Sequence, residues 1–445
     1  MSLRGLAVLL LVLAVLAIAL VRLRGPKEDE KAATEDAPLV AAFDEAKVRA
    51  IRTTCGETSF SLQKGLASGW RLVAPYAAEA DPRETHTILA ALSGARVRKV
   101  IAEATADPAS FGLGPDACTV RLELEGDAAG RTVALGRSSP VGYERYAKDA
   151  KGRIVFADGS LYTAIAKAPD ALEERRLLPL DPESVVRLSI ERPDGTVVLA
   201  RVGEGWRMEA PVRDTADAFE ADRAVRAATS LEMERGTKAT PPTVTPRERR
   251  IALRANGMTA LVAAAGVEGK RLAWREGTGS AGLVPASGIA DFDRPAAAFR
   301  DRLVLGFSSP DVRRVAITRG GTSLTIARAS EAAPWTARQG SEPEAPADGA
   351  RVTALIERLR SVRATSVEDG APPSPPTGTL EVSGEKAQLG RASWGPLPPA
   401  GGEESLWVTT PARAGTYFRV PASAFGPIPQ GLRDLAPSSS PSTSP

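Results

Sequence analysis

A thirteen-residue segment that occurs twice constrains the architecture of this chain more than any other sequence feature. GWRLVAPYAAEAD at 69–81 reappears as GWRMEAPVRDTAD at 205–217, and seven positions are identical. One identical residue is tryptophan, of which the 445-residue chain has six. Coincidence is a poor explanation for this agreement, so we interpret the two segments as the same part of a duplicated structural unit.

Each copy follows a segment that predicts a β-hairpin. Apolar and polar residues alternate on both sides of a turn in VRAIRTTCGETSFSLQKG, which precedes Trp70, and in VVRLSIERPDGTVVLARVGE, which precedes Trp206. A third such segment, VRRVAITRGGTSLTIARAS, precedes Trp335 and has Gly320-Gly321 at the turn. The three tryptophans are 136 and 129 residues apart, which predicts three units in series.

The residues shared between the copies predict where a strand ends and a helix begins. Each tryptophan is expected to pack across its hairpin in the core, although repeated aromatic residues could instead form a platform for a sugar or peptide. A proline keeps the next residues extended. Each aspartate precedes apolar residues at spacings of three and four, so we expect it to cap a helix. These markers are Trp70, Pro75, Asp81, Trp206, Pro211, Asp217, Trp335 and Asp348.

An apolar segment near the start of the chain predicts a transmembrane anchor. Leu6–Val21 is uninterrupted by polar residues and would span roughly 24 Å as a helix, which flanking residues extend towards the bilayer thickness. A cleaved signal peptide with Ala17-Ile18-Ala19 at its cleavage site is the alternative. The positive-inside rule favours a cytoplasmic body. A short leading segment is nevertheless typical of export, so we expect a single-pass inner-membrane protein with a periplasmic body.

The expected fold class is α+β: an N-terminal transmembrane helix followed by three tandem β-rich units, each with a β-meander, one helix and further antiparallel strands. The third unit is degenerate, because its repeat segment lacks the proline. The expected boundaries are a transmembrane anchor at 1–24, a charged tether at 25–43, repeat unit 1 at 44–180, repeat unit 2 at 181–309, repeat unit 3 at 310–436 and a disordered tail at 437–445.

Charge and cysteine content exclude several classes of function. The chain has 57 basic and 54 acidic residues dispersed along it, so it lacks the clustered cations that nucleic-acid binding requires. Cys55 and Cys118 are the only cysteines, which excludes a zinc site of four thiolates. One bridge between them is possible in an oxidising compartment. We expect instead two separate small residues in strands.

The residue types that catalysis uses do not form a recognisable constellation. His86 is the only histidine and is expected on the surface of a helix. Gly277, Gly279 and Gly282 match a dinucleotide fingerprint in letters, but no helix pattern follows, so we expect a loop. The acidic clusters at 28–30, 173–174 and 291–293 are expected to be solvated. We expect no enzyme activity, catalytic residue, cofactor or metal site.

Several of these segments resemble the family known as domain of unknown function 4340. The resemblance covers most of 45–310 and is thinnest in the third unit. It implies a single-pass bacterial membrane protein, because members of the family look like such proteins, and some are encoded beside ABC-transporter components of the gliding-motility type. No catalytic residues carry over from this family. The matching segments are Trp70, Pro75, Ala80-Asp81, SFGLGPDACTVRLEL at 110–124, VALGR at 133–137 and LEERRLLPLD at 172–181.

The expected function is therefore binding or scaffolding by a membrane-anchored envelope protein accessory to an ABC-transporter or gliding-type assembly. Its expected partners are the membrane, through the N-terminal helix, and an envelope or transporter protein, with exposed strand edges as one means of contact. The alternative is an envelope enzyme or a carbohydrate- or peptide-binding module with a cleft between repeat units.

Overall fold

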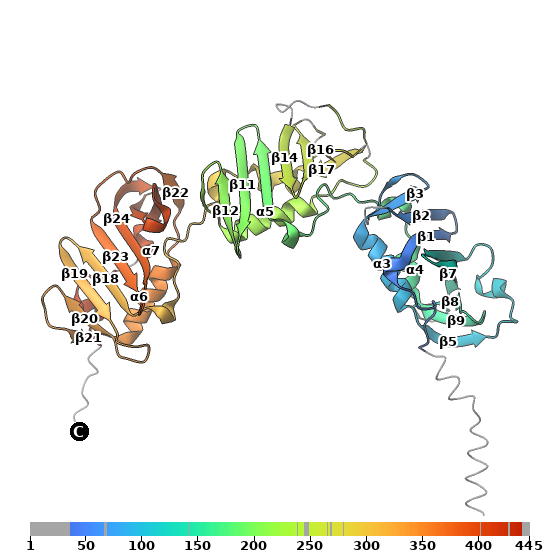
Figure 1. The fold of residues 1–445 in the computed structure, drawn as a ribbon, viewed down its shortest axis with the longest axis horizontal. Helices are drawn as coiled ribbons and strands as arrows, with labels where there is room; N and C mark the ends of the chain where they lie inside the picture. Colours follow the sequence, from blue (N-terminus) through green and yellow to red (C-terminus); the bar gives the residue numbers. More distant parts are fainter. Residues whose placement is uncertain are drawn as a thin grey trace, which may run out of the picture. The chain divides into compact units, whose positions relative to one another are not determined.

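Three antiparallel sheets follow one another along the chain, each with one long helix against one face (Figure 1). The computed structural model describes residues 36–437 except 66–68, 141, 238, 244–248, 265, 268, 279, 401 and 426–427. The described residues group into two compact units. The first unit comprises Met1–Pro179 and Glu232–Ala239, and the second comprises Leu180–Leu231 and Thr240–Pro445.

The first sheet has nine strands in the order β4-β3-β2-β1-β6-β7-β8-β9-β5. Its strands are β1 (Val48–Cys55), β2 (Thr58–Lys64), β3 (Trp70–Ala74), β4 (Ala78–Glu79), β5 (Val97–Ala102), β6 (Cys118–Leu124), β7 (Asp127–Ser138), β8 (Glu144–Lys148) and β9 (Ile154–Asp158). The helices beside it are α3 (Pro82–Gly94) and α4 (Gly159–Ile165), followed by the short 3-10 helix η3 (Pro169–Leu172).

The second sheet has eight strands in the order β13-β12-β11-β10-β14-β15-β16-β17. Its strands are β10 (Arg187–Arg192), β11 (Gly195–Val202), β12 (Gly205–Ala210), β13 (Asp214–Thr215), β14 (Arg249–Ala255), β15 (Met258–Ala263), β16 (Lys270–Arg275) and β17 (Ala281–Pro285). The helix is α5 (Ala218–Ser230), and the 3-10 helices η6 (Ala286–Asp293) and η7 (Ala296–Phe299) follow the last strand.

The third sheet has nine strands in the order β21-β20-β19-β18-β23-β24-β25-β26-β22. Its strands are β18 (Arg314–Arg319), β19 (Thr322–Ala327), β20 (Thr336–Gln339), β21 (Ala345–Pro346), β22 (Ser366–Asp369), β23 (Gly378–Ser383), β24 (Gln388–Ala400), β25 (Glu403–Thr409) and β26 (Thr416–Pro421). The helices are α6 (Gly349–Ser361) and α7 (Ala422–Phe425), and the 3-10 helix η10 (Leu432–Leu435) closes the described chain.

The strand orders show that the three sheets are variants of one topology. In the first and third sheets, the strand after the long helix pairs with the last strand, as β5 does with β9 and β22 with β26. The second sheet contains eight strands among the described residues, and the segment after α5, Glu232–Ala239, belongs to the first unit instead.

The predicted hairpins are confirmed, and their turns explain their register. In the third sheet, Arg319 pairs with Thr322 across the two-residue turn Gly320-Gly321. Both glycines have positive φ, 54° and 80°, as a type I′ turn requires. Pairing of Cys55 with Thr58 and of Arg192 with Gly195 closes the other two hairpins.

The three marker aspartates cap the long helices as predicted. Asp81, Asp217 and Asp348 are the N-cap residues of α3, α5 and α6. Each carboxylate accepts a hydrogen bond from a backbone N–H of the first turn, at 2.8, 3.1 and 2.9 Å respectively. These bonds satisfy donors that would otherwise have no partner within the helix.

The long helices bury an apolar stripe against their sheets. α3 contributes Ile88, Leu89 and Leu92 to the core that contains β1 and β6. The predicted core role of the tryptophans is confirmed for Trp206 and Trp335, which are 4% and 7% exposed, whereas Trp70 is half-buried. Apolar residues at spacings of three and four in the sequence therefore lie on the side of each helix that faces the sheet.

The expected fold class needs correction. The described chain is mostly β, and its longest helices, α3, α5 and α6, have 13 residues each. Thirteen residues of helix extend about 20 Å, less than the bilayer core of about 30 Å. None of the described helices has the length and apolar character needed to cross a membrane. The expected span at 1–24 lies outside the described residues.

The expectation of two separate cysteines is wrong. β1 and β6 are antiparallel neighbours, and the pairing of Thr54 with Thr119 puts Cys55 opposite Cys118. The two sulfurs form a disulfide between these strands, closing a sequence separation of 63 residues. The alternation of apolar and polar residues does not predict this disulfide, because the disulfide depends on which strands become neighbours in the sheet.

Candidate functional site: the ion network at Asp81

The end of the first repeat returns to the start of its helix. Asp81 N–H donates to the carbonyl oxygen of Leu172 at 2.8 Å, and Ala80 forms a β-bridge with Glu173. Glu174 N–H donates to the Glu79 carbonyl at 3.0 Å. The closing segment of this repeat, residues 172–176, therefore lies beside the N-terminus of α3.

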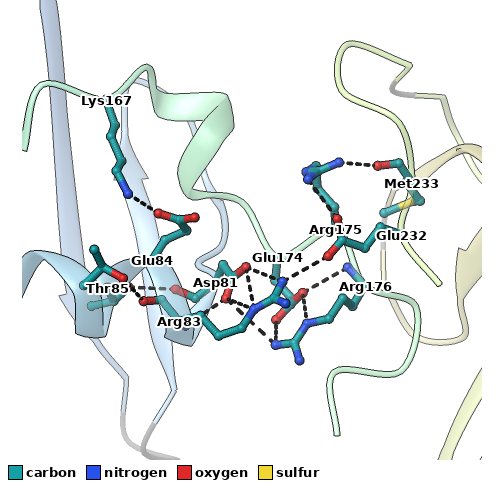
Figure 2. Close-up of polar contacts among 11 residues, drawn as sticks. Asp81, Arg83, Glu84, Thr85, Lys167, Glu174, Arg175, Arg176, Glu232 and Met233 are labelled. Atoms are coloured by element: carbon teal, nitrogen blue, oxygen red, sulfur yellow. Dashed lines mark hydrogen bonds and ion pairs between the residues drawn. The ribbon is translucent and has the colours of Figure 1, made fainter. Parts of the chain in front are cut away.

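Asp81 and Arg83 form the centre of an ion network (Figure 2). The Asp81 carboxylate accepts from Arg83 Nε at 3.2 Å and from Arg83 Nη2 at 2.9 Å, in addition to the backbone N–H of Arg83. Arg176 Nη2 lies 3.9 Å from Asp81 Oδ1. Two arginines thus face one carboxylate that is 6% exposed.

The second pair of the network joins two residues of the closing segment that are two positions apart. Glu174 accepts from Arg176 Nε at 3.0 Å and from Arg176 Nη2 at 2.6 Å, a bidentate arrangement. The side chain of Glu174 is 3% exposed, so the expectation that the acidic pair at 173–174 is solvated is wrong for this residue. Burial is possible because the neighbouring guanidinium neutralises the charge.

The third part of the network holds the segment Glu232–Ala239 on the first unit. Glu232 accepts from Arg83 at 3.0 Å and from Arg175 at 2.9 Å (Figure 2). Arg175 Nη1 also donates to the Met233 carbonyl at 2.7 Å, and Met233 N–H donates to the Arg175 carbonyl at 2.9 Å. Charged and backbone hydrogen bonds together fix this segment.

Electrostatics keep Asp81 ionised. Burial raises the pKa of Asp81, but hydrogen bonds from Arg83 and the charges of Arg83 and Arg176 lower it more, so this pKa is below its usual value. Hydrogen bonds to Asp81 and Glu232 raise the pKa of Arg83. Asp81 and Arg83 are therefore both charged at neutral pH.

The network consists of three carboxylates and three guanidinium groups that neutralise one another. A carboxylate held by arginines at a lowered pKa is a weak base. The arrangement can bind chain segments together, which is a structural and recognition role. Its members are Asp81, Glu174, Glu232, Arg83, Arg175 and Arg176.

The second unit contains a related junction built from different residues. Asp217 N–H donates to the Phe299 carbonyl at 2.8 Å, as Asp81 does to Leu172. The next residue, Arg300, is 4% exposed and donates to Asp214 at 2.5 Å and to Asp369 at 2.9 Å. Burial lowers the pKa of Arg300, but these two carboxylates raise it more.

Asp214 has a second arginine partner. Arg413 forms an ion pair with Asp214 and donates to the Asp301 carbonyl at 2.5 Å. Asp214 lies in β13, and Arg413 precedes β26, so the contact links the second and third sheets inside the second unit.

The marker aspartates pair with arginines, and the marker prolines follow strands. The aspartates each meet an arginine besides capping a helix: Asp217 pairs with Arg363 at 2.6 Å, and Asp348 lies 3.8 Å from Arg351. Pro75 and Pro211 follow β3 and β12 through cis peptide bonds.

The tryptophans are packed rather than presented as a platform. Trp206 Nε1 donates to Asp222 at 2.8 Å, and the guanidinium of Arg201 lies 4.5 Å from its ring centroid. Arg328 lies 4.6 Å from the ring centroid of Trp335. Basic side chains therefore cover both rings.

Sequence analysis did not identify the arginines and glutamates of the network. The run EERR at 173–176 was visible but has the form of a solvated charge cluster. The pairing of Arg83 with Glu232 spans 149 residues, and only the fold brings these residues together.

Of the remaining chemical candidates, His86 and Gly277 are placed as expected. His86 lies on α3 with its side chain 72% exposed and its Nδ1 3.6 Å from Glu45. Gly277 is in a turn before β17, as expected for a loop, whereas Gly282 lies within that strand, so the loop interpretation is wrong for Gly282. Gly279 is outside the described residues. Within residues 36–437 as described, no three metal-ligating side chains cluster.

Comparison with known families gives a match over parts of the first two repeats. The family described as Domain of unknown function (DUF4340) matches residues 70–246. The domain of unknown function 4340 family is thereby confirmed over this range. The DUF4340 match begins at Trp70, includes Asp81 and Asp217, and is narrower than the expected 45–310.

Other comparisons add no functional information to the DUF4340 match. No curated protein matches the chain in sequence. A DNA polymerase sliding clamp from Pseudomonas aeruginosa, solved with ligand, is 8% identical with a TM-score of 0.16, over 86% of this chain and 93% of the clamp. A sliding clamp from Caulobacter crescentus is 7% identical with a TM-score of 0.13, over 88% and 96%. TM-scores this low do not indicate a common fold.

Proposed function

We propose that this chain is a binding or scaffolding protein of the bacterial envelope, accessory to an ABC-transporter or gliding-type assembly. The observation that carries this proposal is the threefold use of one topology, in which a hairpin leads to an Asp-capped helix. Tandem units offer several similar surfaces on one chain, which suits contact with more than one partner segment. The link to a transporter follows from the resemblance to the DUF4340 family.

The ion network at Asp81 supports binding over catalysis. Its charged groups form hydrogen bonds and ion pairs that hold Glu232–Ala239 and the closing segment in place. Rigidly held segments of this kind preorganise a surface, so that association costs less conformational entropy. The surfaces that differ between repeats are then free to recognise partners.

A periplasmic location is part of the proposal. The disulfide between Cys55 and Cys118 supports it, because disulfides persist in oxidising compartments such as the periplasm and are rare in the cytosol. A fusion of alkaline phosphatase after Pro38 tests this point, since the enzyme is active only after export. An inactive phosphatase fusion together with an active β-galactosidase fusion at the same residue would reject the periplasmic location.

The binding role is tested by crosslinking in native membranes. A photoreactive amino acid at exposed positions, such as Phe219 on α5, should give adducts with an envelope or transporter protein that mass spectrometry identifies. The photoreactive amino acid placed at the buried position of Trp206 serves as the control, because it should give no adducts. Recovery of only the uncrosslinked chain from every exposed position would count against a scaffold.

A further inference from the structure

In each of the first two repeats, an ion pair joins the first turn of the long helix to a basic residue near the end of the repeat. Three residues after each capping aspartate lies a glutamate, Glu84 on α3 and Glu220 on α5. Glu84 pairs with Lys167, and Glu220 accepts from Arg294 Nη2 at 2.9 Å. Both basic residues come five positions before the residue whose carbonyl accepts from the aspartate N–H, Leu172 or Phe299.

The third repeat has lost this ion pair. Asp348 N–H donates to the Leu435 carbonyl, which defines the equivalent positions. The residue three after Asp348 is Arg351, and the residue five before Leu435 is Gln430. An arginine therefore replaces the glutamate, and a glutamine replaces the cation.

A cleft of about 600 Å³ occupies the place where the ion pair would be. A volume of this size is ordinary for a ligand site. Its floor is apolar, because Leu355 and Ile428 are 3% and 4% exposed. We name it the arginine cleft, and the lining residues that matter here are Arg351, Leu355, Arg358, Ile428, Gln430 and Arg433.

The arginine cleft has an excess of positive charge. The positions equivalent to Arg358, ten residues after the capping aspartate, are Ala91 and Ala227 in the other repeats. Within the described residues, the guanidinium groups of Arg358 and Arg433 have neither an ion pair nor a hydrogen bond. Asp434 is the one carboxylate among the lining residues, and it accepts from the Gln430 N–H at 2.7 Å.

The spacing of the arginines favours an elongated anion. Arg351 and Arg358 are seven residues apart on α6, which separates them by about 10 Å along the helix axis. In a polyproline II peptide, which has three residues per turn and rises about 3.1 Å per residue, carboxylates three residues apart lie on the same face about 9 Å apart. A single phosphate has no group at that distance, and a flat membrane surface does not reach the apolar floor of a cleft.

We propose that the arginine cleft binds an acidic peptide segment of a partner protein, with carboxylates on the arginines and apolar side chains on Leu355 and Ile428. This inference rests on the proposed scaffolding function and names the surface and the partner chemistry. Arginine suits this role because its fork of donors matches a carboxylate bidentately.

The test measures fluorescence anisotropy of the labelled peptide Glu-Leu-Val-Glu-Leu-Val-Glu with the purified full-length chain. We expect binding that weakens as salt is raised and that is absent for the peptide with Gln in place of each Glu. Arg358→Ala should weaken binding roughly tenfold, the value of one charge-assisted contact. The matched control is Arg226→Ala, an exposed arginine on α5, which should leave the affinity unchanged.

A second variant rebuilds what the other repeats contain. Arg351→Glu combined with Gln430→Arg should create in the third repeat an ion pair equivalent to that of Glu220 and Arg294 in the second. This new pair should abolish peptide binding. Because the change supplies a pair that the fold already accommodates twice, the melting temperature should not fall. Retention of wild-type peptide affinity by this double variant would overturn the proposal.

Two further outcomes would also overturn it. One is equal affinity for the acidic peptide and its Gln form. The other is binding to phosphatidylglycerol vesicles that depends on Arg358 while the peptide does not bind, which would assign the cleft to lipid. If crosslinking still recovers an envelope partner in either case, the scaffolding function stands and only this cleft assignment fails.

Discussion

Asp214 and Arg300 form a buried ion pair, with Oδ2 and Nε 2.5 Å apart and both side chains at most 5% exposed. Arg413, itself 10% exposed, shares the same carboxylate. One aspartate thus pairs with two guanidinium groups from different parts of the second unit.

Asp214→Asn should destabilise the second unit by about 3–5 kcal/mol, because it removes the buried carboxylate that two buried guanidinium groups share and leaves Arg300 with only the exposed Asp369. Urea unfolding of the full-length chain, followed by tryptophan fluorescence, measures the change. The matched control is Asp293→Asn, which breaks the half-exposed pair with Arg250 and should cost less than about 1 kcal/mol. Equal effects of the two variants would show that burial of the Asp214 pair is energetically unimportant.

Asp81 should make the first unit sensitive to acid. Its pKa is lowered in the folded chain, since the bonds and charges of Arg83 and Arg176 outweigh burial. The unfolded chain therefore binds the proton at higher pH, near the usual value of about 3.9. The contribution of Asp81 to stability is complete above that value and is lost as pH falls through the folded pKa.

The pH effect is isolated by comparing wild type with Asp81→Asn. We expect the variant to be less stable at pH 7, with the difference shrinking as the pH falls below about 4. Chemical denaturation at a series of pH values gives the free energy of unfolding. A difference that stays constant across this range would refute the linkage between Asp81 ionisation and folding.

Loss of the disulfide should weaken the first unit. Replacing Cys55 and Cys118 together with alanine should lower the free energy of unfolding by about 2–4 kcal/mol, because the bridge restricts the unfolded chain over a separation of 63 residues. Dithiothreitol should reproduce this loss in the wild type and have no effect on the variant. An unchanged midpoint in urea for the double variant would contradict the prediction.

Trp206→Ala should be among the most damaging single substitutions in the second unit. The ring is buried and bonded to Asp222, so truncation should cost about 3–5 kcal/mol. Phe219→Ala is the control, because that side chain is 67% exposed and its removal should change the melting temperature little. A Trp206→Ala chain that melts with the wild type would reject the core role of the repeated tryptophan.

The repeat could be predicted from sequence because its markers act locally. Alternation gives the hairpins, Gly320-Gly321 gives a turn, and Asp81 caps the helix that begins at the next residue. The ion network could not be predicted, since Arg83 and Glu232 are far apart in sequence and meet only after the sheets have formed. The disulfide was missed for the same reason.

The arginine cleft shows the limit of sequence analysis in a different way. Arg351 and Gln430 are unremarkable alone and become informative only when set against Glu84 and Lys167 of the first repeat. That alignment requires the backbone contact between Asp348 and Leu435, which no pattern in the sequence predicts.

The first unit includes Glu232–Ala239, although the chain between Leu180 and Leu231 belongs to the second unit. The repeated sequence is one continuous segment of the chain, whereas the folded first unit consists of two separate segments. Recombination that excised the DNA for residues 44–180 would deliver an incomplete unit, missing a piece encoded in the next copy. A gene fusion that ends at Pro179 would therefore lack Glu232–Ala239, which Arg83 and Arg175 hold through Glu232.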